Sequence, residues 1–403
     1  MTGSAPKPPA KAPETVAAAN GIGTDAAFGA VAPPLYLSST FAFEGVEREG
    51  PYAYSRAANP SRDMLADTLA KLEGGAGALI TASGMAAIDL VLSRMGADDL
   101  VVAPHDCYWG TYRLLAARAA RRQFSVVFVD QADELAVALA LEDSPSLLLI
   151  ETPSNPLMRV VDIASLAEQA KAAGAAVAVD NTFLSPALQQ PIRLGADYVI
   201  HSTTKYLNGH SDVVGGAVIA AHPDDLEELS TWATTTGVAG APFDAYLTLR
   251  GVRSLFPRIE RQQQTAGALA IFLVGHPAVK AVHYPGLPSH PSHALAARQQ
   301  RGFGAMLSFE LRGGLEAVRA FVGALRVFTL AESLGGIESL VAHPETMTHV
   351  GMSPEARATA GITSGLLRLS VGLEAETDLL ADLDAGLHSV LANRPAGAAV
   401  PVQ

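Results

Sequence analysis

Short apolar runs recur along the first two thirds of the chain, and segments with helical periodicity separate most of them. The runs have the length of buried strands and lie at 78–80, 100–102, 124–129, 147–150, 175–179, 198–200 and 216–219. Helices are predicted between them, for example at 62–72, where two glycines follow, and at 162–173. Alternating strands and helices predict an α/β fold with a mainly parallel sheet. Because the runs are continuous rather than alternating, we expect helices on both faces of that sheet.

The pattern changes after about residue 257. A long helical stretch at 258–274 is followed by strand-like runs at 279–284, 306–311 and 366–371 and by a helix near 316–325. This pattern predicts a smaller α+β domain at the C-terminus. We therefore expect three parts: an N-terminal tail and arm over 1–60, a large domain over 61–256 and a small domain over 257–403.

The first of these parts has no clear hydrophobic period. Residues 1–20 are rich in Ala, Pro and Lys, and we expect them to be disordered. Residues 21–60 combine Gly, Pro and aromatic residues, which favours an extended arm that crosses another surface. The start, Met1-Thr-Gly-Ser, lacks a charged region followed by an apolar one, so no signal peptide is expected.

Composition narrows the class of protein. The chain has 403 residues and a formal net charge of -12, without a basic run, which argues against nucleic acid or anionic membrane as a partner. No apolar run approaches the ~20 residues that a membrane helix needs. Cys107 is the only cysteine, so no intrachain disulfide can form. The 11 histidines are scattered without metal-ligand spacing, so we expect no metal site. The single cysteine and the lack of a long apolar run favour a soluble cytoplasmic protein.

An aspartate and a lysine follow two neighbouring apolar runs. Asp180 comes directly after 175–179, and Lys205 follows 198–200 in the segment His-Ser-Thr-Thr-Lys. Ligands of parallel α/β sheets bind at the carboxyl ends of the strands. A buried lysine can lose its proton and form a Schiff base, and a buried aspartate needs a cationic partner. Pyridoxal phosphate (PLP) satisfies both, since it offers an aldehyde and a pyridinium nitrogen.

Other interpretations of this segment remain open. Ser202-Thr-Thr-Lys205 also matches the Ser-x-x-Lys signature of serine acyl-transfer enzymes, but no Lys-Thr-Gly triplet follows it and the preceding α/β pattern differs. A PLP-type regulator without enzymatic activity would need a basic DNA-binding module, which the chain lacks. An exposed lysine beside a helix start and a helix-capping aspartate are the plain structural alternatives.

Four further positions could complete a cofactor and substrate site. Ser83-Gly84-Met85 opens a predicted helix, where backbone N–H groups could bind a phosphate, although an ordinary turn has the same pattern. Tyr108 could stack on a planar ring or simply pack. Asn155 could bind a ring hydroxyl or form an Asn-Pro turn. Arg368, inside an apolar run, could bind a substrate carboxylate or form a structural ion pair.

These motifs resemble those of the Cys/Met-metabolism family of PLP-dependent enzymes, and the likeness extends over about residues 21–390. The segments that carry it are Tyr54-Ser-Arg56, Asn59-Pro60, Ser83-Gly-Met85, Pro104-His-Asp-Cys-Tyr108, 151–156, 179–186, 201–212, 302–309 and 328–336. The resemblance implies the type I fold of PLP-dependent transferases, with a homotetramer built as a dimer of dimers and active sites shared between chains.

The resemblance also implies a role for each candidate. Lys205 binds the cofactor and moves protons, Asp180 pairs with the pyridinium nitrogen, and Tyr108 stacks on the ring. The residues expected at the phosphate are Gly84, Met85, Ser202 and Thr204, with Tyr54 and Arg56 from a neighbouring subunit. The residues expected at the substrate carboxylate are Arg368, Asn155 and Ser333.

Within the family, the segment 104–113 is similar to members that perform γ-replacement, making L-cystathionine and succinate from O-succinyl-L-homoserine and L-cysteine. Arg113 is placed like an arginine that meets the succinyl carboxylate, and Glu332 resembles a residue that selects the distal amino end of cysteine or cystathionine. The closest alternative is a lyase that cleaves cystathionine to cysteine, 2-oxobutyrate and ammonia. The chain departs from the pattern at Ala53, Ala57 and Trp109. The resemblance therefore does not fix the contacts to the distal group of the substrate or the width of the pocket mouth.

Overall fold

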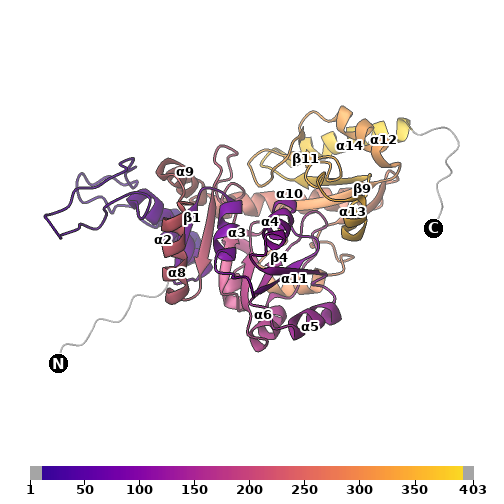
Figure 1. Cartoon of the computed structure of the whole chain (residues 1–403). Coiled ribbons are helices and arrows are strands. Elements are labelled where there is room, and N and C mark those ends of the chain that lie inside the picture. Colours follow the sequence, from indigo (N-terminus) through magenta and orange to yellow (C-terminus); the bar gives the residue numbers. More distant parts are fainter. Residues whose placement is uncertain (1–10, 394–403) are drawn as a thin grey trace, which may run out of the picture.

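The computed structural model describes residues 11–393, and two β-sheets organise this part of the chain (Figure 1). The strands of the larger sheet lie in the order β1-β7-β6-β5-β4-β2-β3. Their bounds are β1 (Gly77–Thr81), β2 (Leu100–Pro104), β3 (Ser125–Val129), β4 (Leu147–Glu151), β5 (Ala176–Asp180), β6 (Tyr198–His201) and β7 (Gly216–Ala220). Each predicted run therefore forms a strand, and the strand ends differ from the predicted ones by no more than about two residues.

Helices cover both faces of the larger sheet, as its continuous apolar runs predict. They are α2 (Pro60–Glu73), α3 (Gly84–Leu92), α4 (Trp109–Ala120), α5 (Glu134–Glu142), α6 (Ile163–Ala172), α7 (Ser185–Leu188), the 3₁₀ helix η1 (Pro191–Leu194), α8 (Pro223–Thr236) and α9 (Pro242–Val252). Alternate residues of one strand join different clusters: Leu147 and Leu149 pack with α3, whereas Leu148 and Ile150 pack with α5 and α6. The strands are consequently buried on both sides.

One strand departs from the expected parallel arrangement. β2, β3, β4, β5 and β6 pair in parallel, but β7 is antiparallel to both β6 and β1. A parallel neighbour requires a crossover connection, usually a helix, on one face of the sheet. The link at 202–215 contains no helix, so β7 returns beside β6 in the opposite direction. The sheet is therefore mixed but mainly parallel, as the sequence predicts.

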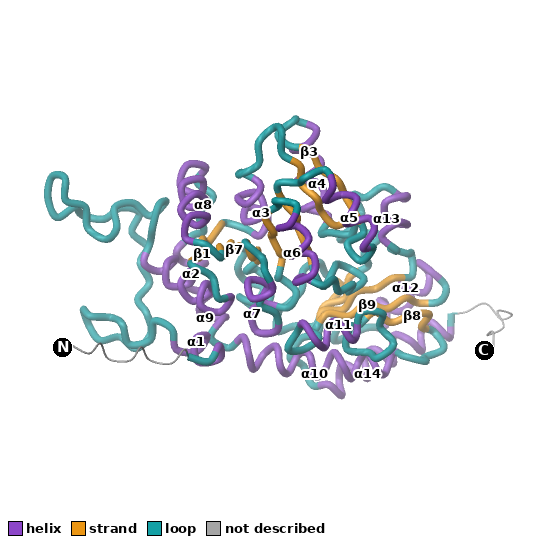
Figure 2. Tube along the Cα trace, turned by 90° about the horizontal axis from the view of Figure 1, so that it is seen from below, coloured by secondary structure: helices purple, strands orange, loops and turns teal. Residues whose placement is uncertain are grey.

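The second sheet has the order β10-β11-β12-β9-β8. Its strands are β8 (Val279–His283), β9 (Met306–Leu311), β10 (Thr329–Leu330), β11 (Leu340–Ala342) and β12 (Leu366–Ser370), and the helices of this region are α10 (Leu255–Leu273), α11 (His293–Gln299), α12 (Gly314–Ala324), α13 (Pro354–Ala360) and α14 (Glu376–Ala392). Figure 2 shows α10 and α14 along the same side of this sheet, where Phe309 of β9 meets Phe321 of α12 with ring centroids 5.5 Å apart. We propose the domain boundary near residue 256, at the start of α10.

The N-terminal tail was expected to be disordered over 1–20, and this expectation is wrong for its second half. Residues 1–10 lie outside the described part, but Pro13–Ala19 forms helix α1, helped by a proline at its first turn and several alanines. Ala17 is buried, and Arg253 donates from Nη1 to the Ala18 carbonyl at 2.9 Å. These tertiary contacts are what the local composition could not reveal.

Residues 21–59 form the arm, with no helix and only isolated bridges such as Thr40 to Tyr54. The arm projects from the body beside α2 and α9 (Figure 1). It exposes large apolar side chains, including Phe28 at 95%, Val46 at 93% and Val31 at 70%. Its extended form agrees with the sequence-based expectation.

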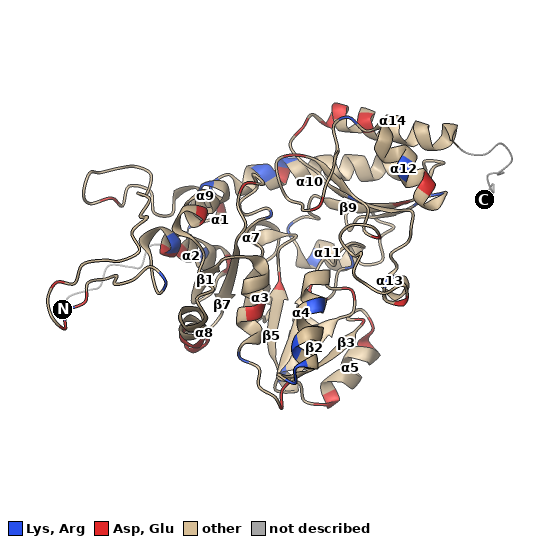
Figure 3. Ribbon diagram, turned by 45° about the horizontal axis from the view of Figure 1, so that its top comes forward, with Lys and Arg blue, Asp and Glu red and all other residues tan. Residues whose placement is uncertain are grey.

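Charged side chains are spread over the outer helices and loops rather than gathered in a basic stripe (Figure 3). Between residues 11 and 393, no group of three or more His, Cys, Asp and Glu side chains is arranged to hold a metal ion. Among the helices of the same range, none is long and apolar enough to cross a membrane.

Candidate active site

Asp180 and Lys205 follow from the ends of two adjacent parallel strands, β5 and β6. Asp180 is the last residue of β5, and Lys205 lies in the turn that follows β6. The turn closes on itself, because Lys205 N donates to the Ser202 carbonyl at 3.2 Å and Gly209 N donates to the Lys205 carbonyl at 2.8 Å. We call Asp180 at the end of β5, residues 202–205 after β6 and Gly84 and Met85 at the start of α3 the strand-end cradle.

Lys205 reaches across to the second sheet. Its Nζ donates to Ser333 Oγ at 2.7 Å. Burial and, to a smaller extent, the positive charge of Arg368 lower the pKa of Lys205 to about 8, while Glu332 acts in the opposite direction. A substantial fraction of this amine is therefore neutral near physiological pH, which is the form that attacks a carbonyl carbon or accepts a proton.

Asp180 is a carboxylate without a cationic partner. It accepts a hydrogen bond from Thr182 N at 3.0 Å and forms no ion pair with any residue that the structure describes. Burial raises the pKa of Asp180, whereas the hydrogen bonds from Thr182 and the charge on His201 lower it. A carboxylate below the surface in this situation needs a cation beside it, and the pyridinium nitrogen of PLP fits that requirement.

The start of α3 lies against the lysine turn. Ser83 caps the helix by accepting from Ala86 N at 3.1 Å. A Cβ atom on Gly84 would lie 2.7 Å from Ser202 Cβ, so only glycine permits this approach. Backbone N–H groups at a helix start and the Ser202 hydroxyl therefore meet, which suits a phosphate group. The Thr204 hydroxyl is instead engaged with Gly215, accepting from its N–H at 3.0 Å.

Tyr108 stands at the entrance to the cradle. It precedes α4, and its N–H donates to Glu151 Oε2 at 2.8 Å. Glu151 ends β4 directly opposite Asp180 in the sheet register. The Tyr108 ring and the Met85 sulfur both lie close to Gly110, since a Cβ on Gly110 would be 2.5 Å from Tyr108 Cε1 and 2.8 Å from Met85 Sδ. With 43% of Tyr108 exposed, the other side of its ring is free to stack on a planar group.

Arg368 and its partners bring the second sheet into the site. Arg368 in β12 is 3% exposed and donates from Nη1 to Asn155 Oδ1 at 2.9 Å and from Nη2 to the Ser333 carbonyl at 2.8 Å. Its Nε has no hydrogen-bond partner within residues 11–393. Ser333 has a positive φ of 79°, a conformation that costs energy for a residue with a side chain. A buried guanidinium with a free donor suits a substrate carboxylate.

The remaining substrate candidates lie further out. Glu332 is exposed, and its charge raises the pKa of Lys205, which places it within electrostatic range of the amine. Arg113 is exposed on α4 and makes no hydrogen bond or ion pair with described residues. Trp109 stacks with Tyr112 at 5.5 Å between centroids and lies against Gly351. Glu332 and Arg113 are thus exposed, whereas Arg368 is buried.

Tyr54 and Arg56 are not brought to the cradle in the single chain. Tyr54 is 50% exposed, and the Arg56 guanidinium lies 5.7 Å from the centroid of its ring. Arg56 Nη1 donates to the Thr234 carbonyl at 2.6 Å, near the end of α8. No hydrogen bond joins either residue to Lys205, Ser202 or Gly84 in the described structure.

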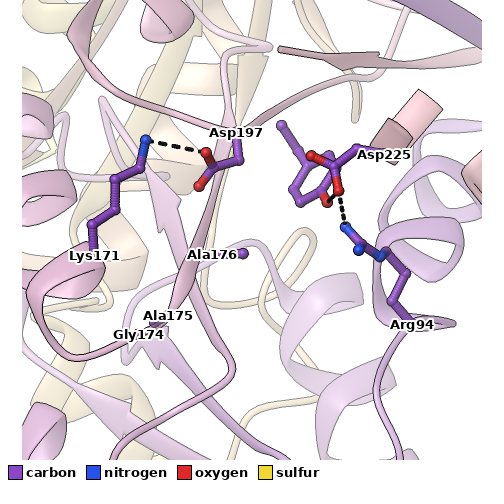
Figure 4. A pocket seen from close by; sticks show the side chains of 8 residues that line it. Arg94, Lys171, Gly174, Ala175, Ala176, Asp197 and Asp225 are labelled. Atoms are coloured by element: carbon purple, nitrogen blue, oxygen red, sulfur yellow. Dashed lines mark hydrogen bonds and ion pairs between the residues drawn. The ribbon is translucent and has the colours of Figure 1, made fainter. Parts of the chain in front are cut away.

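A cavity of about 340 Å³ lies at the opposite, amino-terminal edge of the larger sheet (Figure 4). Its charged side chains are already paired: Lys171 lies 3.1 Å from Asp197, and Arg94 lies 2.7 Å from Asp225. A second cavity of about 390 Å³ lies between the arm and α9 and is lined by Tyr36, Met64 and others. Neither contains the strained, electrostatically perturbed groups found at the cradle.

Sequence reasoning missed several residues that shape the site. Glu151 ends a predicted strand and holds the Tyr108 backbone, so its place after an apolar run could have identified it. Glu73 and His201 form a buried pair at 2.6 Å, and neither was among the candidate site residues. The signal for Glu73 was an acidic residue at a helix C-terminus, where the helix dipole disfavours it.

Comparison with known proteins gives a consistent result. Residues 14–388 match the family model described as "Cys/Met metabolism PLP-dependent enzyme". The chain is 54% identical to cystathionine gamma-synthase of Escherichia coli (strain K12) over 93% of this chain and 97% of that protein. It superposes with a TM-score of 0.95 on cystathionine gamma-synthase of Xanthomonas oryzae pv. oryzae in complex with cystathionine, at 55% identity over 95% of this chain and 100% of that one. A cystathionine gamma-lyase of Bacillus subtilis is 44% identical over 92% of this chain and 97% of that protein.

Proposed function

Because the chain belongs to the Cys/Met metabolism family of PLP-dependent enzymes, we propose that it forms L-cystathionine by γ-replacement, with O-succinyl-L-homoserine and L-cysteine as substrates and succinate as the leaving product. The protein is a PLP-dependent enzyme of fold type I. The observation that carries the proposed reaction is the position of Lys205: a buried amine whose pKa is lowered to about 8, bonded to Ser333 and within electrostatic range of Arg368.

The residues of the cradle would hold the cofactor as follows. Lys205 would hold the aldehyde carbon, Asp180 the ring nitrogen, and Tyr108 the face of the ring. Gly84, Met85, Ser202 and Thr204 would surround the phosphate, and Asn155 would lie at the side of the ring. When bound, PLP supplies an electron sink that accepts charge from the substrate Cα. Asp180 supports this role because a carboxylate stabilises a protonated ring nitrogen.

Arg368 sets the position of the amino-acid substrate. Its free Nε and the adjacent Nη2 can grip the α-carboxylate from one side while Nη1 stays bonded to Asn155, which leaves Cα within reach of Lys205 Nζ. Lys205 takes the proton from Cα and returns protons later in the turnover. Ser333 Oγ accepts a hydrogen bond from Lys205 Nζ and so keeps the amine aimed at this position between transfers.

Replacement requires that the Cγ–O bond to succinate breaks and that the thiol sulfur of cysteine forms a new bond to Cγ. Arg113 is exposed and free to meet the distal succinyl carboxylate. Glu332 can attract the ammonium group of cysteine. Ala53 and Ala57 offer no charge for the distal groups, so we assign that selection to Arg113 and Glu332.

We further propose that the working enzyme is a homotetramer, a dimer of dimers, in which Tyr54 and Arg56 of one chain complete the phosphate cup of its neighbour. Support comes from the arm, which exposes Phe28, Val31 and Val46 and in which Arg56 binds the Thr234 carbonyl rather than a cradle residue of its own chain. Exposed apolar side chains of this size are typical of an interface. We place the reaction in the cytoplasm, since the single cysteine is free and buried.

The test supplies each substrate combination to the purified enzyme. We expect cystathionine formation from O-succinyl-L-homoserine plus cysteine to be faster than 2-oxobutyrate release from cystathionine. The reverse ranking would favour the lyase, a second candidate that the 44% identity to a cystathionine gamma-lyase supports. O-acetyl-L-homoserine in a parallel assay identifies the preferred acyl group.

A further inference from the structure

A single carboxylate oxygen connects the two chain segments that form the cradle. Glu73, the last residue of α2, is 0% exposed. Its Oε1 accepts from Asn181 Nδ2 at 2.9 Å and lies 2.6 Å from His201 Nε2. Asn181 directly follows Asp180, and His201 directly precedes Ser202. Glu73 therefore binds Asn181 and His201, which are the chain neighbours of Asp180 and Ser202, the two residues proposed to face the cofactor.

Backbone contacts join the same two segments in front of Glu73. Asn181 N donates to the Ile200 carbonyl at 3.0 Å, and Ser202 N donates to Thr182 Oγ1 at 2.9 Å. Thr182 N in turn donates to Asp180 Oδ1 at 3.0 Å. A shift of either strand end is consequently transmitted to the Asp180 carboxylate and to the Ser202 turn.

Gln189 extends the connection to a third strand end. Its Nε2 donates to Asn181 Oδ1 at 3.1 Å and to the carbonyl of Thr152, the residue after β4, also at 3.1 Å. Glu73, Asn181, Gln189 and His201 are all at most 2% exposed. The carboxyl ends of β4, β5 and β6 are thus held by one buried polar network.

Stability alone does not explain a glutamate at this position. The helix dipole places negative charge at the C-terminal end of α2, and burial disfavours an ionised carboxylate. Glu73 Oε2 has no hydrogen-bond partner in the described structure. A well-packed apolar side chain can replace a buried ionic pair with no loss of stability, so the acceptor at this point serves another purpose.

We propose that Glu73 is a positioning residue for the cofactor: through Asn181 and His201 it sets the separation between Asp180, at the ring nitrogen, and Ser202, at the phosphate. The proposal rests on the roles assigned above to Asp180 and Ser202. Glu73 itself touches neither cofactor nor substrate. Supporting residues of this kind keep binding groups within a fraction of an ångström of the productive geometry.

The test measures cofactor affinity rather than turnover. Holoenzyme variants are stripped of PLP and titrated with it, and the dissociation constant is read from the visible absorbance. We expect Glu73→Leu to raise the dissociation constant on the order of 10- to 100-fold, as the loss of outer supporting groups does at metal sites. Glu73→Gln keeps an acceptor for Asn181 and should have a smaller effect. Substrate KM at saturating PLP should stay near the parent value.

Thr68→Val is the matched control. Thr68 is also 0% exposed on α2. Its hydroxyl donates to the Met64 carbonyl at 2.7 Å and accepts from Asn20 Nδ2 at 2.8 Å, and neither partner belongs to the Glu73 network. This variant should lower the melting temperature and leave the dissociation constant unchanged. If Glu73→Leu behaves like Thr68→Val, with lower stability and parental affinity, Glu73 is merely structural and the proposal is wrong.

Two further variants keep the test decisive. If Glu73→Leu does not fold, parental affinity in both Glu73→Gln and Asn181→Ala overturns the proposal. Asp180→Asn distinguishes a failure of this proposal from a failure of the cofactor role assigned to Asp180. Weaker binding in Asp180→Asn combined with parental binding in the Glu73 variants overturns the role of Glu73 alone, whereas parental binding in Asp180→Asn removes the assigned role of Asp180.

Discussion

The strand-end cradle and the N-terminal arm both carry residues proposed to bind the cofactor, but they are built in opposite ways. In the cradle, Asp180, Ser202 and Lys205 make hydrogen bonds with the loop after β5 and with Ser333, in the loop between β10 and β11. In the arm, Tyr54 is half exposed, and the hydrogen bonds are mainly local, such as Phe41 N to the Ala53 carbonyl.

This difference indicates which half of the site a single chain can build. The cradle follows from the packing of one chain, since its contacts join segments that the fold already brings together. The arm presents apolar side chains that burial against another surface would stabilise. We therefore expect variants of the cradle to act on the chain that carries them and variants of the arm to act on a neighbour.

The largest effect should come from Lys205→Ala. Removing a positioned acid–base group typically costs ~10²–10⁴-fold in rate, and Lys205 also holds the cofactor. Cystathionine formation under saturating substrates measures the loss. Turnover at the parental rate in the purified variant would contradict the central role of the cradle.

Asp180→Asn should have the next largest effect. A charge pair at 4 Å and an effective dielectric near 20 is worth roughly 4 kcal/mol, which corresponds to a loss of up to about 10³-fold in kcat. The melting temperature of the stripped protein should change little, because Asp180 has no ion pair among residues 11–393 to lose. A kcat equal to that of the parent would contradict the assigned pairing.

A smaller loss is expected from Arg56→Ala, and it should be repairable. Loss of a hydrogen bond to a charged group costs about 1.5–3 kcal/mol, so PLP affinity should fall roughly 10- to 100-fold. Mixing Arg56→Ala subunits with Lys205→Ala subunits should restore part of the activity, because some sites then combine an intact arm with an intact lysine. The control mixes two Lys205→Ala preparations. If subunits exchange without any recovery, the arm does not serve a neighbouring site.

The smallest effect concerns pH. Burial lowers the pKa of Lys205 to about 8, and only the neutral amine reacts with an aldehyde, so PLP uptake by the stripped enzyme should accelerate as pH rises through 8. Between pH 7 and 9 the neutral fraction increases about tenfold. Arg368→Leu should move the midpoint upward, because it removes a positive charge, whereas Arg56→Ala should leave it in place. Stopped-flow absorbance measures the rate of PLP uptake by both variants as a function of pH. An equal shift of the midpoint in the two variants would contradict the comparison.

The sequence was most informative where the physical signal is local. Apolar runs predicted every strand of the larger sheet and β8, β9 and β12 of the second sheet, but not the two short strands β10 and β11. The ends of two runs located Asp180 and Lys205, because a polar residue directly after a buried strand is confined to the sheet edge. The direction of β7 was missed because the apolar run is the same in either direction. Helix α1 was missed because a helix of this length needs the contacts with Arg253 and α2 in addition to the helix propensity of its own residues.

The supporting network was beyond sequence reasoning for a different reason. Glu73 lies more than a hundred residues before Asn181 and His201 in the chain, and nothing in the local pattern of α2 indicates that its last side chain turns inward. The roles of Arg113, Glu332, Tyr54 and Arg56 stay predictions, since their distal partners belong to substrates or to another chain.

The reversal of β7 has a consequence for the order in which the enzyme folds. Because β7 returns beside β6, the segment that carries Lys205 is closed at its base by neighbours in sequence, with Tyr198 opposite Ala220 and His201 opposite Ala217. Such a hairpin has little loop-closure entropy to overcome. The lysine and its hydroxyl neighbours should thus be assembled early, and Ser333 and Arg368, supplied by a distant stretch of chain, should dock onto a nucleophile that is already in place.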